Sequence, residues 1–535
     1  MKPLTTSVLA IAALMCLALT GVRARYLLHM LQLEEYDPRR FFHWVVGHSK
    51  RLYGNYPLDA LGVMGLAIVI VHPSRPVVAA VSGGMAVALC VGGLLQEFRW
   101  MKAPAKKALV MTPRAWRLLA CCLIIGAAAS VVPFVSSRWW DLAASLLLPL
   151  AAPLLMLLSR FIMEPVEASI RDWYVRDARG ILAGFAPTVV GVTGSYGKTS
   201  TKFFTAHLLE SRYRVLMTPE SYNTAMGICR VIRGELGPEH EVFVVELAEN
   251  ERGGFGHLLR LAPCSISIVT SVGLQHLEEF GSEAAIRRVM QGFVRMPGSG
   301  PTVVLNGDDP VLSDIQGVPG KRLLRASASG SLSSDLRAEN VAMGADGLSF
   351  DIVTSQGERF AYHTTVLGRH NVENILLAVA VAHDLGVSWS SIQDGISTLQ
   401  APPHRLQMML GAGGVRIIDD AFNSNPAGFA MAMEVLAGFS SRRVLVTPGL
   451  VSLGTAEDAA NVEAGRQAAR AADTVILVGP AKTRPVREGL VSAGFPETSI
   501  FTARSLEEVT ALMRSLLEPG DTVMFENDLP DTYDE

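Results

Sequence analysis

The fold of this chain follows from one stretch of its sequence, Thr193-Gly194-Ser195-Tyr196-Gly197-Lys198-Thr199-Ser200. Two glycines allow backbone N–H groups to turn inward and bind phosphate oxygens. The lysine adds a positive charge, and the threonine hydroxyl can bind Mg²⁺. The preceding residues 188–192 predict a buried strand and residues 201–209 predict a helix. The full phosphate-loop pattern needs glycine at position 192, where this chain has Val192, so the match is to a shorter Gly-x-x-Gly-Lys-Thr form. The stretch predicts a site for ATP and Mg²⁺.

Length and charge limit the possible functions. A chain of 535 residues predicts three or four domains. A net charge of −3, with no basic patch rich in aromatic residues, argues against a nucleic-acid partner. The six cysteines include no Cys-x-x-Cys pair, so we expect neither a zinc site nor a disulfide framework.

The first 165 residues are rich in apolar runs. Each run is close to the length that spans a hydrocarbon core of about 30 Å. Lys and Arg gather between the first and second runs and between the third and fourth, so these segments are expected in the cytoplasm. We therefore expect an α-helical membrane region of about five spans in residues 1–165. The protein would be a multi-pass protein of the cytoplasmic membrane, with its soluble domains facing the cytoplasm. The runs are residues 4–19, 58–71, 77–95, 118–135 and 142–158.

From about residue 180 onward, short apolar runs alternate with helical patterns, which predicts two parallel α/β domains. Pro402 and Pro403 interrupt helix propagation and mark the boundary between them. We expect an ATP-binding domain in residues 180–402 and a Rossmann-like domain in residues 403–535. The predicted strands are residues 242–247, 267–272, 303–305, 415–419, 443–447, 474–478 and 522–525.

Several further blocks, together with the phosphate loop, follow one another in the order found in a known family. They span roughly residues 186–485, and six blocks in order are far more specific than one. On these residues the chain resembles the Mur ligase family, and within it the MurF-type branch that adds D-alanyl-D-alanine to a muropeptide. The blocks are Val244-Val245-Glu246-Leu247, Gln275-His276-Leu277-Glu278, Asn306-Gly307-Asp308-Asp309-Pro310, Gly368-Arg369-His370-Asn371-Val372-Glu373-Asn374 and Asp419-Asp420-Ala421-Phe422-Asn423-Ser424-Asn425-Pro426.

The resemblance implies a fold and a reaction. The fold would be a central phosphate-loop ATPase domain followed by a Rossmann-like C-terminal domain. In the reaction, a substrate carboxylate attacks the γ-phosphate of ATP, and an amine attacks the resulting acyl phosphate to form an amide. Such an enzyme mainly positions its reactants and stabilises phosphoryl charge. Its partners would be a muropeptide, either a small molecule or lipid-linked, and an amino acid or dipeptide that supplies the amine.

The resemblance also implies roles for particular residues. Lys198, His276 and Arg405 would be catalytic, with Lys198 bridging the β- and γ-phosphates and Arg405 reaching the γ-phosphate as the domains close. Thr199 and Glu246 would bind a first Mg²⁺, and His276 would help to bind a second. Asn371 could also cap the helix that follows it. The residues expected to contact the nucleotide are Gly194, Ser195, Tyr196, Gly197, Lys198, Thr199, Ser200, Asn371, Asn374, Arg405, Asp420 and Asn423.

The chain departs from the family pattern in three places. Met290 stands where the family has a carbamylated lysine, so the second metal site is left open, with Glu278 or Glu249 as substitute ligands. Membrane spans would replace the N-terminal domain that binds UDP. Residues 525–531 replace a Lys-Gly-Ser segment, and residues 448–450 replace an often acidic position. Both lie in the domain that would receive the amine, so D-alanyl-D-alanine cannot be assumed.

Two other functions remain open on the sequence. The first is an amide ligase that builds poly-γ-glutamate or another polymer. The second is a degenerate paralogue that acts as a membrane scaffold. The intact phosphate loop, Glu246 and His276 argue against the scaffold, which would not need them. The acceptor, the amine and the oligomeric state are not given by the sequence.

Overall fold

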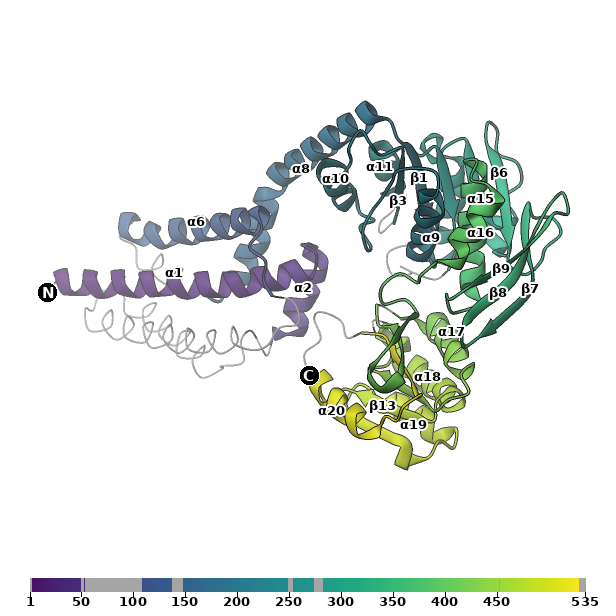
Figure 1. Ribbon diagram of the computed structural model, residues 1–535. Helices are drawn as coiled ribbons and strands as arrows, with labels where there is room; N and C mark the ends of the chain where they lie inside the picture. The colour runs from purple at the N-terminus through teal and green to yellow at the C-terminus, as the bar shows by residue number, and fades with distance from the viewer. Residues whose placement is uncertain are drawn as a thin grey trace. The chain divides into compact units, whose positions relative to one another are not determined.

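The computed structural model describes residues 2–49, 52, 108–136, 148–248, 254–273, 282–422, 424–451 and 453–528. The chain divides into two compact units between Asp172 and Trp173. The first unit is helical in its described part. The second contains two β-sheets, which carry the residues of interest (Figure 1).

Helices pack against one another in the first unit. Helix α1 lies beside α6, as Figure 1 shows. Leu28, Phe41, Leu118 and Met156 are among the residues of their shared apolar cluster. The helices are α1 (Lys2–Leu33), α2 (Pro38–Gly47), α6 (Pro113–Ser136) and α8 (Ala152–Phe185), and α8 continues into the second unit.

The expected membrane region is not found. Within the ranges that the structure describes, no helix is long and apolar enough to cross a membrane. A span needs about 20 consecutive apolar residues, but the apolar run that opens α8 at Ala152 meets Arg160 after a few residues. The predictions of a five-span membrane region and of a multi-pass cytoplasmic-membrane protein are therefore wrong for this part of the chain. The runs at residues 58–71 and 77–95 lie outside the described residues.

The first sheet of the second unit has the order β2-β3-β1-β4-β5-β6-β7-β8-β9. Along the sheet, each strand from β2 as far as β7 is parallel to the next one. The last two pairs, β7 with β8 and β8 with β9, are antiparallel. The strands are β1 (Thr188–Thr193), β2 (Val215–Met217), β3 (Val242–Glu246), β4 (Ile266–Val269), β5 (Thr302–Asn306), β6 (Arg322–Ser327), β7 (Leu336–Gly344), β8 (Gly347–Thr354) and β9 (Arg359–Thr364).

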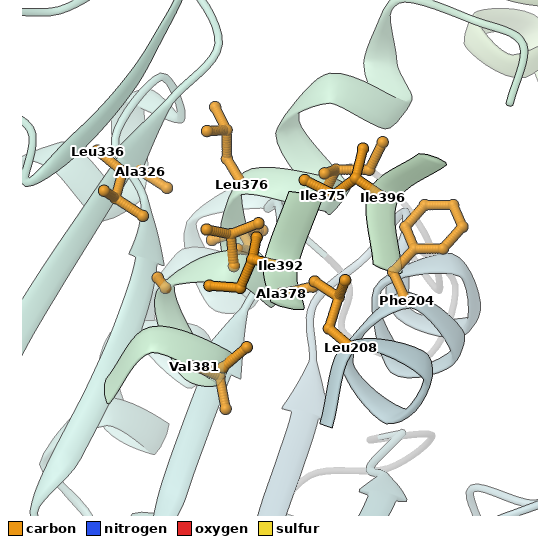
Figure 2. Close-up of a cluster of buried hydrophobic side chains, with 14 of the residues drawn as sticks. Phe204, Leu208, Ala326, Leu336, Ile375, Leu376, Ala378, Val381, Ile392 and Ile396 are labelled. Atoms are coloured by element: carbon orange, nitrogen blue, oxygen red, sulfur yellow. The ribbon is translucent and has the colours of Figure 1, made fainter. Parts of the chain in front are cut away.

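Helices cover both faces of this sheet, because successive side chains of a strand point to opposite faces. In β1, Val190 joins the cluster under α9, α15 and α16, whereas Val189 joins the cluster on the other face. Figure 2 shows Phe204 and Leu208 of α9 packing with residues of α15 and α16. The helices are α9 (Lys198–Glu210), α10 (Ala225–Gly234), α11 (Gly254–Leu261), α13 (Glu283–Arg295), α14 (Pro310–Ser313), α15 (His370–Asp384) and α16 (Trp389–Ser397).

The second sheet has the order β10-β11-β15-β12-β13-β14 and is parallel apart from β10. Its strands β11, β15 and β12 are neighbours, so their carboxyl ends lie at one edge. The strands are β10 (Gln407–Leu410), β11 (Arg416–Asp420), β12 (Arg443–Thr447), β13 (Thr474–Val478), β14 (Ile500–Ala503) and β15 (Thr522–Glu526), and the helices are α17 (Pro426–Ala437), α18 (Glu457–Ala471), α19 (Arg484–Ser492) and α20 (Leu506–Leu516).

The structure confirms the two α/β sheets. The strands predicted at residues 443–447 and 474–478 coincide with β12 and β13. The other predicted strands are found with ends displaced by one to three residues. Seven strands were not predicted: β2, β6, β7, β8, β9, β10 and β14. In β7, three of the nine residues are the polar Arg337, Glu339 and Asn340, so the strand lacks a continuous apolar run.

Candidate active site

A bend with two glycines connects β1 to α9. Gly194 has φ +136° and Gly197 has φ +78°, conformations that other residues rarely adopt. A Cβ at Gly194 would lie 2.1 Å from Thr270 Oγ1, and a Cβ at Gly197 would lie 2.4 Å from Asn374 Oδ1. Both positions therefore need glycine, for backbone conformation and for space.

The N-terminus of α9 is arranged to receive an anion. Gly197 is the N-cap residue, and no side chain of the described residues caps this end of the helix. The first N–H groups of a helix have no partner within the helix, and the helix dipole makes this end positive. Lys198, Thr199 and Ser200 form the first turn, so the helix begins three residues before the predicted start at residue 201. This geometry fits a phosphate group.

Lys198 folds back over the bend that precedes it. Its Nζ donates hydrogen bonds to the carbonyl oxygens of Gly194 at 2.8 Å and Ser195 at 2.9 Å. Burial lowers the pKa of Lys198 to about 8, an effect that Glu246 opposes and Arg405 strengthens. A bound anion would compete with two neutral carbonyl oxygens for this ammonium group, and charged acceptors bind more strongly.

The loop after β4 supports the bend. The backbone N–H of Ser195 donates to the carbonyl oxygen of Ser271 at 2.6 Å. The backbone N–H of Gly273 donates to Ser195 Oγ at 2.8 Å. A Cβ at Gly273 would lie 2.2 Å from the Tyr196 ring, so this ring packs closely on the glycine. Ser195 and Tyr196 thus fix the bend from one side.

Glu246 ends β3 with a carboxylate that is 1% exposed. Thr199 Oγ1 donates to Glu246 Oε2 at 3.0 Å, and Asn223 Nδ2 donates to Glu246 Oε1 at 3.0 Å. Lys202 Nζ lies 3.3 Å from Glu246 Oε2. The structure therefore brings Thr199 and Glu246 together, as predicted, and holds the carboxylate in a fixed position beside the bend.

The sequence motifs did not identify Lys202 and Asn223 as residues of the site. Lys202 is completely buried, and a buried charge needs a partner, which Glu246 supplies. One signal was available: Lys202 follows Lys198 by four residues, so both project from the same face of α9. The contact of Asn223 with Glu246 joins segments far apart in the chain and has no local signal.

Asn371 and Asn374 are buried at the start of α15, each 3% exposed. Asn371 Nδ2 donates to the carbonyl oxygen of Leu367 at 2.7 Å, and Asn374 Nδ2 donates to Asn371 Oδ1 at 2.9 Å. Thr201 Oγ1 of α9 donates to Asn374 Oδ1 at 3.1 Å. The pair is therefore beside the phosphate bend. Asn371 lies inside the helix, whose N-cap is Arg369, so its interpretation as a cap is wrong.

Arg405 lies in the segment between the two sheets. Its neighbours His404 and Leu406 have φ of +60° and +49°. His404 Nδ1 lies 2.7 Å from Asp419 Oδ2, and the backbone N–H of Leu406 donates to Asp420 Oδ1 at 3.1 Å. Arg405 is thus attached through both neighbours to the end of β11.

The positive charge of Arg405 acts on the bend. The Arg405 guanidinium lies 4.6 Å from the centre of the Phe422 ring. Burial is the main cause that lowers the pKa of Lys198 and of Lys202, and Arg405 lowers both further, while Glu246 raises both. Lys202 thus forms an ion pair with Glu246, and the Glu246 charge also acts on Lys198 and Arg405, so positive charge exceeds negative charge here and favours a polyanion.

Of the remaining predicted site residues, the structure describes Asp420 but not His276 or Asn423. Burial raises the pKa of Asp420 to about 6, although the backbone N–H of Leu406 and the Arg405 charge oppose this. His276 and Asn423 lie outside the described residues, as do the substitute ligands Glu249 and Glu278.

The donor atoms of Thr199 and Glu246 fit Mg²⁺, which prefers hard oxygen ligands. Among the side chains that the structure describes, no group of three or more His, Cys, Asp or Glu residues could hold a metal ion. Met290 of α13 is 7% exposed and packs in the apolar cluster that includes Phe293. Its side chain therefore has a packing role at the position of the expected lysine.

Known proteins match the chain over the same segments. Residues 192–382 match the Mur ligase middle domain, and residues 404–526 match the family described as Mur ligase, glutamate ligase domain. The UDP-N-acetylmuramoyl-tripeptide–D-alanyl-D-alanine ligase of Escherichia coli (strain K12) is 30% identical over 329 residues, which cover 59% of this chain and 72% of the relative. The ligase of the same name from Bacillus subtilis (strain 168) is 27% identical over 292 residues, 54% of this chain and 62% of the relative.

Solved structures show the same fold. MurF from Acinetobacter baumannii has a TM-score of 0.60 and 24% identity, covering 68% of this chain and 78% of that one. The MurF ligase from Thermotoga maritima in complex with ADP has a TM-score of 0.58 and 24% identity, covering 68% of this chain and 81% of that one. The sequence-based prediction of an ATP-dependent peptide ligase is confirmed, and the chain belongs to the Mur ligase family.

Proposed function

We propose that this enzyme uses ATP to join a cell-wall peptide to the amine of an amino acid or dipeptide. A carboxylate oxygen of the peptide attacks the γ-phosphorus, ADP leaves, and an acyl phosphate forms. The amine nitrogen then attacks the acyl carbon, phosphate leaves, and the nitrogen loses a proton. The names of the curated relatives favour a UDP-linked muramoyl tripeptide as acceptor and D-alanyl-D-alanine as the amine.

One observation carries this proposal: the buried Glu246 beside the open end of α9 forms an ion pair with Lys202, and its charge also acts on Lys198 and Arg405. A triphosphate needs this combination of positive charge and free N–H groups. Phosphoryl transfer depends mainly on positioning and on stabilising charge. A scaffold protein would have no use for a buried ion pair of Lys202 and Glu246 beside a glycine bend.

The side chains have separate tasks in this proposal. Lys198 leaves the carbonyl oxygens of Gly194 and Ser195 and binds the β- and γ-phosphates. The negative charge of the phosphates keeps its ammonium group protonated. Arg405 stabilises charge on the γ-phosphate as it passes to the carboxylate. Asn374 holds the bend in place through its contact with Thr201.

Thr199 and Glu246 are the residues that would hold a magnesium ion. When bound, the ion would neutralise part of the charge on the phosphates. Asn223 and Lys202 orient the Glu246 carboxylate, which fixes the ligand before any ion arrives. We also propose that residues 180–402 and 403–535 are the two domains of the enzyme.

The test measures phosphate release and product mass with purified full-length protein, ATP and Mg²⁺. The acceptor is UDP-N-acetylmuramoyl-tripeptide, and the amines are D-alanyl-D-alanine, single amino acids and glutamate. Lys198→Ala should abolish product formation, whereas Lys482→Ala, at an exposed position of the second sheet's domain, is the matched control.

An ATP-dependent gain in acceptor mass that equals one amine minus water supports the proposal. Polymer formation with glutamate alone would instead favour the polymer-forming ligase. Product formation by Lys198→Ala at the wild-type rate would refute the proposed site.

A further inference from the structure

Arg405 lies in a strained stretch of backbone. Its neighbours His404 and Leu406 both have positive φ, +60° and +49°, in a region that residues with a side chain rarely adopt. Such conformations are unfavourable and persist only where surrounding contacts hold them, and they are concentrated at functional sites. The contacts around Arg405 therefore show what this stretch is built to hold.

The end of β11 and the loop after it hold the backbone on both sides of Arg405. The backbone N–H of Phe422 donates to the carbonyl oxygen of His404 at 3.2 Å. On the other side, the backbone N–H of Leu406 donates to Asp420 Oδ1 at 3.1 Å. The Leu406 side chain is 4% exposed and belongs to the apolar cluster of the second sheet. The position of the Arg405 backbone is thus fixed.

Phe422 also contacts the charged end of Arg405. The guanidinium lies 4.6 Å from the centre of the Phe422 ring. The ring is 42% exposed, and in the part of the chain that the structure describes it belongs to neither apolar cluster of the second sheet. Core packing therefore does not explain an aromatic side chain at this position. One residue holds the backbone beside Arg405 through its N–H and the guanidinium through its ring.

Two carboxylates could compete with the ring for Arg405. Burial lowers the pKa of Arg405, and the charges of Glu246 and Asp420 oppose this. Within the described ranges, however, neither carboxylate forms an ion pair with the guanidinium. An aromatic face attracts a cation without accepting a hydrogen bond from each of its N–H groups. Stacking on Phe422 therefore leaves the N–H donors of Arg405 to phosphate oxygens.

We propose that Phe422 is a positioning residue, whose ring holds the Arg405 guanidinium in the orientation that meets the γ-phosphate. The inference rests on the proposed function, in which Arg405 stabilises charge on this phosphate during its transfer. Phe422 acts through Arg405 and does not itself touch the reacting atoms. An interaction made mainly in the transition state changes kcat rather than nucleotide affinity. Loss of the ring should therefore slow the reaction without weakening ADP binding.

The test compares wild-type enzyme with Phe422→Leu, Phe422→Tyr and two controls, Val491→Ala and Glu518→Gln. Leucine is apolar but has no ring face, whereas tyrosine keeps the face. Val491 has the same exposed fraction as Phe422, 42%, and Glu518 is an exposed residue of the same domain.

The reaction is measured with the full-length chain, ATP, Mg²⁺ and UDP-N-acetylmuramoyl-tripeptide. The acyl phosphate is captured by D-alanyl-D-alanine as the peptide or, in a separate assay, by hydroxylamine as a hydroxamate. Calorimetry gives ADP affinity, and urea unfolding shows whether each variant is folded.

We expect Phe422→Leu to lower kcat roughly 3- to 30-fold, because a contact between a ring face and a cation is lost. Peptide and hydroxamate formation should fall by the same factor, since both depend on phosphoryl transfer. The dissociation constant of ADP, which has no γ-phosphate, should stay within about twofold of wild type. Phe422→Tyr and both controls should keep the wild-type kcat.

A second comparison asks whether the ring acts through Arg405. In an Arg405→Ala background, followed over longer incubations, Phe422→Leu should cause no further loss. The inference is overturned if Phe422→Leu changes kcat by less than about twofold, weakens ADP binding, lowers peptide but not hydroxamate formation, or causes a further loss without Arg405. If wild-type enzyme forms neither product, the proposed function itself fails and the inference falls with it.

Discussion

Replacing Glu526 by glutamine should make the protein more stable at alkaline pH. Burial raises the pKa of this carboxyl group from its ordinary value of 4.5 to about 8 in the folded protein. Between these two values the folded state binds a proton that the unfolded state does not bind. The free energy of unfolding therefore falls as pH rises from about 4.5 to about 8. Glutamine cannot ionise, so the variant does not lose this stability.

The size of the effect follows from the same two values. The gap between 4.5 and about 8 corresponds to roughly 5 kcal/mol at most. Coupling with Asp420 spreads the titration over both groups, so we expect a difference on the order of 2–5 kcal/mol above about pH 8. Glutamine keeps an acceptor oxygen for Thr447, so the packing of β12 against β15 is retained.

The assay is urea unfolding of wild-type protein, Glu526→Gln and Glu518→Gln between about pH 5 and about pH 9. Hydrogen exchange of β15 amides gives a second, local readout. The Glu526→Gln difference should be near zero at the acidic end and should grow with pH, while Glu518→Gln should follow wild type throughout. A difference that stays flat, or a variant that is less stable at alkaline pH, would show that Glu526 is ionised and paired in the folded protein.

Three further predictions concern the phosphate bend. Gly197→Ala should abolish ADP binding in calorimetry and lower the free energy of unfolding by about 1–3 kcal/mol. Gly320→Ala is the control: Gly320 also has a positive φ, +74°, but a new Cβ there meets open space. This control should keep ADP binding. Lys202→Met should lower the free energy of unfolding by about 3–5 kcal/mol because it leaves a buried carboxylate unpaired, and adding Glu246→Gln should restore most of the loss in urea unfolding. ADP affinity should fall as pH rises above about 8, where free Lys198 loses its proton, and calorimetry of Lys198→Gln should show no such step.

The bend and the parallel strands could be predicted because their signals are local. Glycines at positions 194 and 197 are required by the backbone they occupy, and fully buried strands such as β3 appear as continuous apolar runs. The pairing of Thr199 with Glu246 came from the resemblance, which supplies long-range contacts that periodicity cannot supply.

Other features could not be predicted, for physical reasons. The stretch at residues 142–158 resembled a span because apolar residues dominate it, but in its described part the helix begins at Ala152 and reaches Arg160 after a few residues. The contact between Lys202 and Glu246 joins residues 44 positions apart, and the buried oxygen of Glu526 exists only because three strand ends meet. Such features depend on tertiary structure and have no pattern in the neighbouring sequence.

The attachment of Arg405 to β11 has a consequence for the timing of ATP consumption. His404 and Leu406 tie this arginine to the second sheet, although its charge acts on side chains of the first. A displacement of the second sheet would carry the guanidinium group away and leave a nucleotide in the bend without the Arg405 charge. In the proposed reaction, ATP would then be consumed only while the second sheet holds Arg405 in position, and hydrolysis without product would be suppressed.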